Sequence, residues 1–263
     1  MPVLSSEAVV LRTWPLREAD LIVSLFTRDY GRLKGVAKSA LKSRRRFGGA
    51  LEPMTLARAF FAERPGQELL RLDQFEILAS PLSRPVDATR LAVLSFYAEL
   101  IDEALPERDP QDAVFRLLVS VLEHTTALQP KTLPAQSSGP WMPLTYFSLW
   151  MTRLMGLLPD LAHCTACGEA LRAEEVGFSP YADGLYCHVH SSPSFHSLSP
   201  DSWHLAQQML RAPVARFAAQ PWPRQQAADL RRFTLQSLER HLEKKLRTAP
   251  LLARFAEAAP PDC

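Results

Sequence analysis

Glycine is scarce in this sequence, with 10 among 263 residues, and no glycine stands in a nucleotide-binding pattern. The pair Gly48-Gly49 is not followed by the Lys-Ser/Thr that holds phosphates. A Gly-x-Ser-x-Gly nucleophile elbow and a His-Glu-x-x-His metalloprotease motif are also missing. Cys164 follows His163 and not the proline that a zinc deaminase needs. We therefore predict a protein that is not an enzyme and has no small-molecule substrate.

Long apolar stretches are missing too, because no run of 18 apolar residues occurs. A membrane span is therefore not expected. The first ten residues do not show the basic segment followed by an apolar run that marks a secretory signal. We expect a cytoplasmic protein, in a reducing environment where cysteines stay as thiols or bind metal.

Cysteine is rare, and three of the four cysteines gather in one segment. Cys164 and Cys167 form a Cys-x-x-Cys pair, and Cys187 and His190 form a Cys-x-x-His pair after 19 intervening residues. Two such pairs can enclose one tetrahedral ion, and thiolates with a neutral imidazole suit zinc. Four protein ligands leave no position for a reacting water, so we predict a structural Zn²⁺ site.

Two alternatives stay open for this segment. A disulfide framework is the usual explanation of an even number of cysteines, although Cys263 stands apart at the last position. His163 and His188 could also replace His190 as the fourth ligand. We prefer His190 because its two-residue gap from Cys187 repeats the gap within the first pair.

The net charge is only +2, but the charges are unevenly distributed. Between Gly31 and Leu51 there are seven basic residues and no acidic residue. From Arg224 to Arg247, seven basic residues stand against three acidic ones. Many acidic residues gather instead between Asp87 and Asp112. A nearly neutral total therefore conceals two positive regions.

The first 80 residues show the pattern of short strands separated by turns. Apolar and β-branched residues predict five strands, at residues 8–11, 21–26, 32–38, 55–62 and 69–77. Five short strands at this spacing favour the five-stranded oligonucleotide-binding (OB) barrel. An SH3-like barrel would give a similar pattern.

The loop expected between the third and fourth strands, residues 39–49, is rich in Lys and Arg. Most charged loops are merely solvated, but this loop has no acidic residue to balance it. It also continues from a strand on which Lys34 and Lys38 share a face. Such a positive track attracts phosphate backbones largely without regard to sequence. The sequence therefore predicts a nucleic-acid-binding surface.

Both positive regions contribute candidates to this surface. The candidate DNA-binding residues are Arg32, Lys34, Lys38, Lys42, Arg44, Arg45, Arg46, Arg231, Arg232, Lys244 and Lys245. Three aromatic residues, Trp14, Phe47 and Phe60, could stack on bases. The pattern does not choose among these three.

The remainder of the chain is expected to be mainly helical. Apolar residues at helical spacing predict helices at 88–105, 144–158 and 224–246. Asp109 is expected to cap a further helix with Pro110 at its first position, and Ser199 with Pro200 opens another. A Pro- and Ser-rich linker is expected at 129–140.

The predicted fold class is α+β, with an N-terminal five-stranded OB-fold barrel followed by an α-helical domain with an inserted zinc ribbon. The barrel is assigned to residues 1–80. The helical domain is assigned to two parts, 81–162 and 199–263, and the zinc ribbon to 163–198.

Several short motifs occur in a characteristic order along the chain. The N-terminal ones are Glu7–Arg12, Arg17–Asp20, Thr27–Gly31, and Gly35–Ser39 running to Leu51–Pro53. The most specific stretch is Gly156–Leu161 followed by Cys164–Gly168, and Lys244–Arg247 comes last. In this order the chain resembles the bacterial RecO family of recombination mediators over nearly its whole length. His190 is a departure, because a fourth Cys is commoner in the family.

The resemblance implies a function in DNA repair and recombination. Members of this family bind single- and double-stranded DNA, anneal complementary strands and work with the partner RecR. They help to load the RecA recombinase onto DNA coated by single-strand-binding protein, whose acidic tail they contact. The resemblance also implies a cytoplasmic, nucleoid-associated location.

Two other functions fit the residues alone. A zinc-stapled scaffold could use its basic loop to bind an acidic protein partner, and an OB barrel could bind RNA instead of DNA. Titration with random single-stranded DNA at two salt concentrations separates the scaffold from a DNA-binding protein. Competition between RNA and DNA of equal length tests the RNA-binding alternative.

Overall fold

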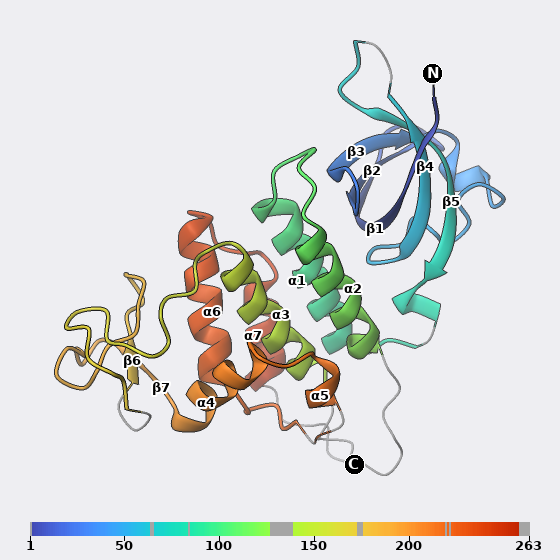
Figure 1. Cartoon of the computed structure of the whole chain (residues 1–263). Coiled ribbons are helices and arrows are strands. Elements are labelled where there is room, and N and C mark those ends of the chain that lie inside the picture. The colour runs from blue at the N-terminus through green and yellow to red at the C-terminus, as the bar shows by residue number, and fades with distance from the viewer. Residues whose placement is uncertain are drawn as a thin grey trace. The chain divides into compact units, whose positions relative to one another are not determined.

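A computed structural model of the chain describes residues 2–63, 66–83, 85–126, 139–172, 176–218, 220 and 222–257 (Figure 1). These residues form two compact units. The first unit comprises the described residues up to Thr126 together with Arg247–Ala249. The second comprises the described residues from Gly139 to Leu246 together with those from Pro250 to Glu257.

A closed barrel of five strands forms most of the first unit. Its order is β1-β2-β3-β5-β4, and all pairs are antiparallel except β3 with β5. The strands are β1 (Leu4–Pro15), β2 (Leu21–Thr27), β3 (Gly31–Ala37), β4 (Leu56–Ala62) and β5 (Leu70–Ala79). The predicted fold class, a five-stranded barrel followed by helices, is confirmed.

Strand β1 is long enough to pair with two neighbours, and this closes the barrel. Its first half pairs with β4 from Leu4 to Val9, and its second half pairs with β2 from Ala8 to Pro15. A register shift between Val10 and Arg12 marks a bulge in the second half. Such a bulge bends a strand, as a closed barrel requires.

Alternation along the strands separates the barrel core from its outer face. On β3, Leu33 and Ala37 belong to the core, whereas Arg32, Lys34 and Val36 face outward and remain partly exposed. Burial of a large apolar side chain in such a core stabilises the fold by about 1.5–3 kcal/mol. The basic side chains of β3 are therefore on the outer surface.

Two helices, α1 (Ala88–Ala104) and α2 (Asp112–Thr126), complete the first unit with the short 3-10 turns η1 (Ala40–Lys42) and η2 (Pro81–Ser83). The predicted helix start at Asp109 and Pro110 is wrong, because α2 begins at Asp112. The preceding segment is held extended along β3 instead. Glu107 forms a parallel bridge with Arg32, and the Arg108 N–H donates to the Arg32 carbonyl at 2.9 Å.

A buried carboxylate in α1 holds the segment at Arg247 and Thr248, which belongs to the first unit although it follows α6 in the chain. Glu99 is buried, and its carboxylate accepts from the backbone N–H groups of Arg247 and Thr248 at 2.8 and 2.9 Å. It also accepts from the Thr248 hydroxyl at 2.7 Å. Three donors on one buried carboxylate satisfy a charge that would otherwise be costly to bury.

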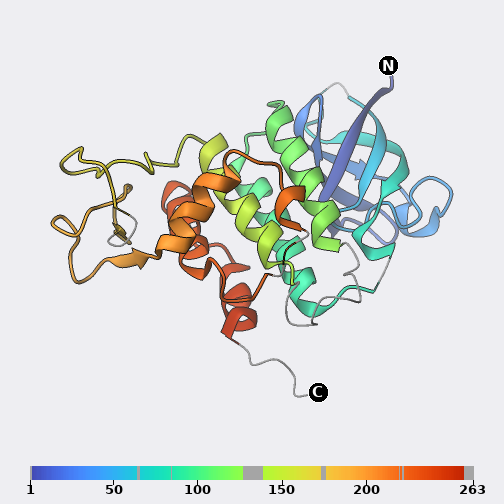
Figure 2. The ribbon, with the colours of Figure 1, turned by 60° about the horizontal axis from the view of Figure 1, so that its bottom comes forward.

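The second unit contains helices and one small sheet. The helices are α3 (Trp141–Leu154), α4 (Pro200–Met209), α5 (Ala215–Ala218), α6 (Ala228–His241) and α7 (Ala249–Glu257), whose first residue belongs to the first unit. Helix α6 packs against α3 and α4, as Figure 2 shows from a second side. The sheet pairs β6 (Val176–Phe178) with β7 (His196–Leu198).

The start of α4 agrees with the prediction, whereas the ends of α3 and α6 differ from it. Helix α4 is capped by Ser199 with Pro200 at its first position, as expected. Helix α3 ends at Leu154, near Gly156 with its φ of +73°. Helix α6 is shorter than the predicted 224–246, because Ala227 and Glu243 adopt left-handed backbone angles at its two ends. The predicted linker at 129–140 lies outside the described residues except for its last two positions.

None of the helices in the described part of the chain is both long and apolar enough to cross a membrane.

Replacing Gly31 by Ala should lower the free energy of unfolding by about 2 kcal/mol or more. Gly31 has φ +68°, and a Cβ at this position would collide with the backbone of Asp109. Urea denaturation measures the loss. The control is Gly49→Ala, because a Cβ there meets no atom within 4 Å. Equal effects of the two substitutions would contradict the assigned role of Gly31.

Candidate nucleic-acid interface and metal centre

Two of the predicted DNA-binding residues, Arg32 and Lys34, are engaged in ion pairs within the first unit. Arg32 Nη1 lies 3.2 Å from Asp102 Oδ1 and 3.4 Å from Glu107 Oε1, and Arg32 Nε donates to the Leu105 carbonyl at 3.0 Å. Lys34 Nζ lies 2.8 Å from Glu107 Oε1. Acidic residues therefore compensate the positive charge that was expected to extend along β3. The acids come from α1 and the segment that follows it.

These ion pairs reduce the positive charge of the β3 surface. The Arg32 side chain is only 13% exposed and the Asp102 side chain 10%, so their pair is largely shielded from water. The hydrogen bond from Lys34 lowers the pKa of Glu107. Burial opposes this shift, and the positive charges of Lys34, Arg32 and Arg108 add to it. Arg32 thus has a structural role in joining β3 to α1.

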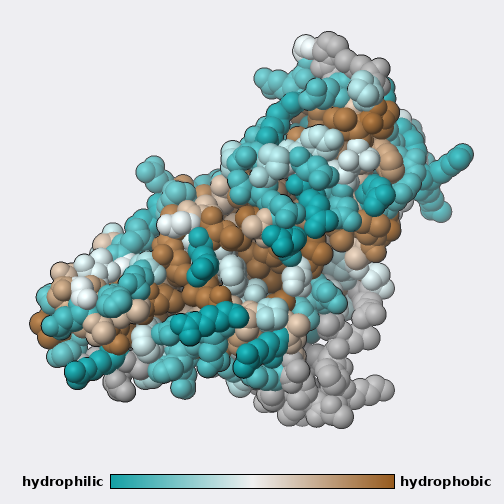
Figure 3. Space-filling model, in the orientation of Figure 1, coloured by the Kyte–Doolittle hydropathy of each residue, from teal (hydrophilic) through white to brown (hydrophobic). Residues whose placement is uncertain are grey.

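The loop after β3 keeps its positive charge unbalanced. Lys38, Lys42, Arg44 and Arg45 are exposed, and none forms an ion pair with any residue that the structure describes. In Figure 3 hydrophilic side chains project from the barrel on the side of this light-blue loop of Figure 1. These four residues are the part of the predicted track that is available to an external anion.

Arg46 shapes this loop from within. Its guanidinium donates to the Lys38 carbonyl at 2.7 Å and to the Ser43 hydroxyl at 3.1 Å. It also lies over the Phe47 ring at 5.0 Å. Phe47 in turn is buried in the barrel core, where its ring centroid is 6.0 Å from that of Phe75. Phe47 is therefore a core residue and cannot stack on bases from this position.

In the second unit, too, some predicted basic residues make structural contacts and others are exposed. Arg231 donates to the carbonyls of Gln226 and Arg224 at 2.7 Å each, and its guanidinium lies over the Trp141 ring at 5.2 Å. Burial lowers the pKa of Arg231 to about 10, so it remains charged near neutral pH. Arg231 is thus a structural residue.

The other basic residues of this region lie on the surface. Arg232, Lys244 and Lys245 are exposed, and Lys245 Nζ lies 2.6 Å from Glu239 Oε2.

The four predicted metal ligands converge in the second unit. The Sγ atoms of Cys164, Cys167 and Cys187 and a ring nitrogen of His190 all lie within 4.8 Å of one another. His190 Nδ1 lies 3.3 Å from Cys187 Sγ and 3.9 Å from Cys164 Sγ. Ligands of a tetrahedral zinc ion are separated by roughly 3.5–3.8 Å, so the donor set and its spacing fit that metal.

Tight turns build this cluster. The Gly168 N–H donates to the Cys164 carbonyl at 2.8 Å, and Gly168 has the φ of +74° that favours glycine after the first pair. The His190 N–H donates to the Cys187 carbonyl at 3.0 Å in the second pair. Burial opposes ionisation of the Cys164 thiol, but backbone N–H donors, including that of Cys187, outweigh it and lower its pKa. A thiolate is the form that binds metal.

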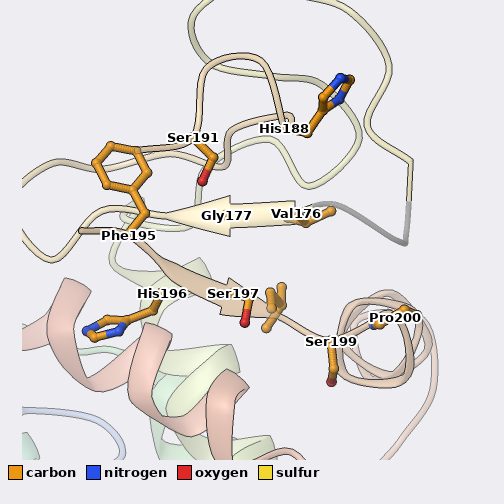
Figure 4. Close-up of a pocket in the computed structure, with 10 residues that line it drawn as sticks. Val176, Gly177, His188, Ser191, Phe195, His196, Ser197, Ser199 and Pro200 are labelled. Atoms are coloured by element: carbon orange, nitrogen blue, oxygen red, sulfur yellow. The ribbon is translucent and has the colours of Figure 1, made fainter. Parts of the chain in front are cut away.

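The alternative ligands are placed elsewhere. His163 Nδ1 lies 2.7 Å from Asp160 Oδ2. His188 lines an open cavity of about 410 Å³ with β6, β7 and the start of α4 (Figure 4). The labelled side chains of His188 and His196 point away from one another there. This cavity therefore does not bring its two imidazoles together as a catalytic pair.

Two family models match the chain. The model described as "Recombination protein O N terminal" matches residues 1–81, and "Recombination protein O C terminal" matches residues 85–250. The chain belongs to the RecO family. The resemblance stated from the motifs is confirmed, and with it membership of a DNA repair and recombination family whose N-terminal domain is an OB fold.

Relatives in the RecO family match along most of their length. The DNA repair protein RecO of Koribacter versatilis is 54% identical over 250 residues, which cover 95% of this chain and 98% of that protein. DNA repair protein RecO of Anaeromyxobacter sp. strain K is 33% identical over 241 residues, covering 90% and 91%. That of Syntrophotalea carbinolica is 28% identical over 256 residues, covering 97% and 96%.

Replacing Glu107 by Gln should lower the free energy of unfolding near neutral pH, by up to about 1 kcal/mol because the pair with Lys34 is partly exposed. Lys34 holds the pKa of Glu107 below its usual value. The carboxylate therefore stabilises the folded state above its unfolded pKa, and this stability is lost as the pH falls through the folded pKa.

Urea denaturation of the wild type and of Glu107→Gln, near neutral pH and below about pH 4, measures the difference in their free energies of unfolding. The exposed Glu52→Gln is the control. The difference between wild type and Glu107→Gln should shrink below about pH 4. A constant difference at both pH values would contradict the assigned ion pair.

Proposed function

We propose that the protein is a non-enzymatic recombination mediator that binds single- and double-stranded DNA through the basic loop of its barrel, largely without sequence preference. The observation that carries this proposal is that Lys38, Lys42, Arg44 and Arg45 are exposed and form no ion pair within the described part of the chain. Cations of this kind neutralise phosphates and release counterions, which supplies affinity for any sequence. Membership of the RecO family supports DNA as the anion.

Annealing follows from the same arrangement. Two complementary strands repel each other, and a shared positive loop lowers that repulsion. Contacts to phosphates leave the base edges free to pair. A protein that enclosed the bases deeply would block the product. Exposed lysines and arginines on a surface loop suit this task better than a closed cleft.

The partners proposed for this activity come from the family. We infer that the protein works with RecR, contacts the acidic tail of single-strand-binding protein and helps RecA to load onto coated DNA. Arg232, Lys244 and Lys245 are exposed and stay candidates for DNA contact in the second unit. A cytoplasmic, nucleoid-associated location is expected for a protein with these partners.

Reversing two loop charges, with Arg44→Glu and Arg45→Glu together, should weaken binding of DNA and slow strand annealing. The slope of log K against log salt should become less steep by about 1.4 for a single strand, since each lost phosphate contact contributes roughly 0.7. Fluorescence anisotropy at several salt concentrations measures the slope.

A matched control reverses the exposed Arg211 and Arg254 in the second unit, which changes the net charge equally. If this control weakens binding as much as the loop variant does, the loop is not the binding site. An unchanged slope in the loop variant leads to the same conclusion.

We also infer that the Cys164, Cys167, Cys187 and His190 cluster binds one structural Zn²⁺ ion. The donor set supports zinc, since three thiolates and an imidazole close a tetrahedral shell. Bound zinc would link the two tight turns and so stabilise the fold of the second unit. The histidine makes the affinity depend on pH more than a fourth cysteine would, because imidazole must be neutral to bind.

Replacing Cys167 by Ser should remove zinc and lower the melting temperature while leaving DNA affinity within about twofold of wild type. The physical reason is that the cluster and the basic loop belong to different units. Metal analysis, thermal unfolding and DNA titration of one sample measure the three quantities. His163→Ala is the control that should keep zinc. Loss of DNA affinity in proportion to zinc, with the fold intact, would overturn this structural role.

A further inference from the structure

Three apolar side chains stand at the hairpin end of the barrel, beside the basic loop. Leu41 in η1 is 64% exposed, Leu16 in the β1–β2 hairpin is 43% exposed, and Trp14 at the end of β1 is partly exposed. We call these three residues the apolar rim. Exposure of two leucines contributes nothing to the folding of the barrel, because a leucine stabilises a fold only when it is buried.

Backbone hydrogen bonds hold the rim in place. The Leu41 N–H donates to the Ala19 carbonyl at 3.2 Å, and the Leu16 N–H donates to the Asp20 carbonyl at 3.0 Å. The Asp20 carboxylate accepts from the Ser39 N–H at 2.7 Å, where Ser39 has a φ of +52°. The hairpin and the basic loop are thus fastened side by side, and Leu41 is presented from a fixed backbone.

Trp14 extends the rim onto the outer face of the barrel. It pairs with Ile22, while its neighbour Thr13 pairs with the core residue Val23, so Trp14 faces outward. The Arg12 guanidinium lies 5.7 Å from the centroid of the Trp14 ring. An aromatic ring beside a cation is an arrangement on which nucleobases stack.

The charge around the rim is mainly positive. Within the hairpin and the loop, the cations are Arg17, Lys38, Lys42, Arg44, Arg45 and the inward-bonded Arg46, and the acids are Glu18 and Asp20. Asp20 is already occupied by the Ser39 N–H. A ligand that matches this surface is a polyanion with exposed apolar faces. Single-stranded DNA has both properties, whereas the bases of a duplex are stacked inside.

We propose that the apolar rim binds unpaired bases of single-stranded DNA while the loop cations bind its phosphates. This inference rests on the proposed function and adds that the hairpin end of the barrel discriminates single strands from duplex. Leu16 and Leu41 contact the bases, and Trp14 provides a stacking surface. Because the rim lies beside the cations, one strand can use both contacts.

The test uses the full-length protein with an oligo-dT and with an abasic oligomer of the same length, which has the same phosphates but no bases. Wild type should bind oligo-dT roughly five- to tenfold more tightly than the abasic oligomer. In the double variant Leu16→Ser, Leu41→Ser this ratio should fall at least twofold, although Trp14 can still stack, while affinity for the abasic oligomer and for duplex stays the same. Both side chains are exposed, so folding is not compromised.

Two further variants serve as controls. Val3→Ser removes an apolar side chain that is 54% exposed and precedes β1, at the end opposite the hairpin, and should leave the ratio unchanged. Trp14→Phe should keep most of the preference for bases, whereas Trp14→Leu should lower it at least twofold although it preserves an apolar side chain. Equal behaviour of these two Trp14 variants would overturn the stacking role.

The outcomes separate this inference from the proposed function. If wild type binds neither DNA, the proposed function fails. If it binds oligo-dT and the abasic oligomer equally, DNA binding stands and the rim inference fails. If the rim variants lose binding to anionic phosphatidylglycerol vesicles but keep their preference for bases, the rim is a membrane contact and the inference also fails.

Discussion

The carboxylate of Asp102 joins three elements of the first unit. It accepts from the Ser24 hydroxyl on β2 at 2.9 Å and from Arg32 on β3 at 3.2 Å, while its own residue lies in α1. A largely shielded ion pair contributes little net stability, but removing one partner costs roughly 3–5 kcal/mol because the other charge is left unpaired. The backbone of Arg32 also holds the segment after α1, because its carbonyl accepts from the Arg108 N–H at 2.9 Å. The contact with Asp102 removes Arg32 from the positive surface, whereas Lys38, Lys42, Arg44 and Arg45 in the basic loop stay exposed.

The barrel could be predicted from the sequence because its signal is local. The apolar run of β2, the alternation in β3 and the turns between the strands follow from neighbouring residues, so strand number and order of elements were expected. The zinc-type cluster was also predictable, because Gly168 and the two-residue gaps impose tight turns within each pair. What could not be predicted were the two ends of α6. Left-handed angles at Ala227 and Glu243 are not typical of those residues, and no local pattern indicates them.

The DNA-binding candidates show where local patterns stop being informative. Lys42, Arg46 and Arg231 look alike as basic residues in positive regions, but their surroundings differ. Lys42 is exposed, Arg46 holds the loop through the Lys38 carbonyl, and Arg231 lies over Trp141. Arg32 and its partner Asp102 are 70 positions apart in the chain, and Arg231 and the Thr145 hydroxyl to which it also donates are 86 positions apart. Such pairings are set by the tertiary fold, so only the structure separates cations that bind partners from cations that stabilise the protein.

The three hydrogen bonds on Glu99 make the first unit discontinuous in sequence. The barrel with α1 and α2 is complete only when residues near position 247 have returned to α1, after residues 127–246 of the second unit have been synthesised. During translation the carboxylate of Glu99 must therefore remain hydrated or find another donor. The contact between Glu99 and residues 247–248 forms late, so complete folding of the first unit depends on the synthesis of that segment.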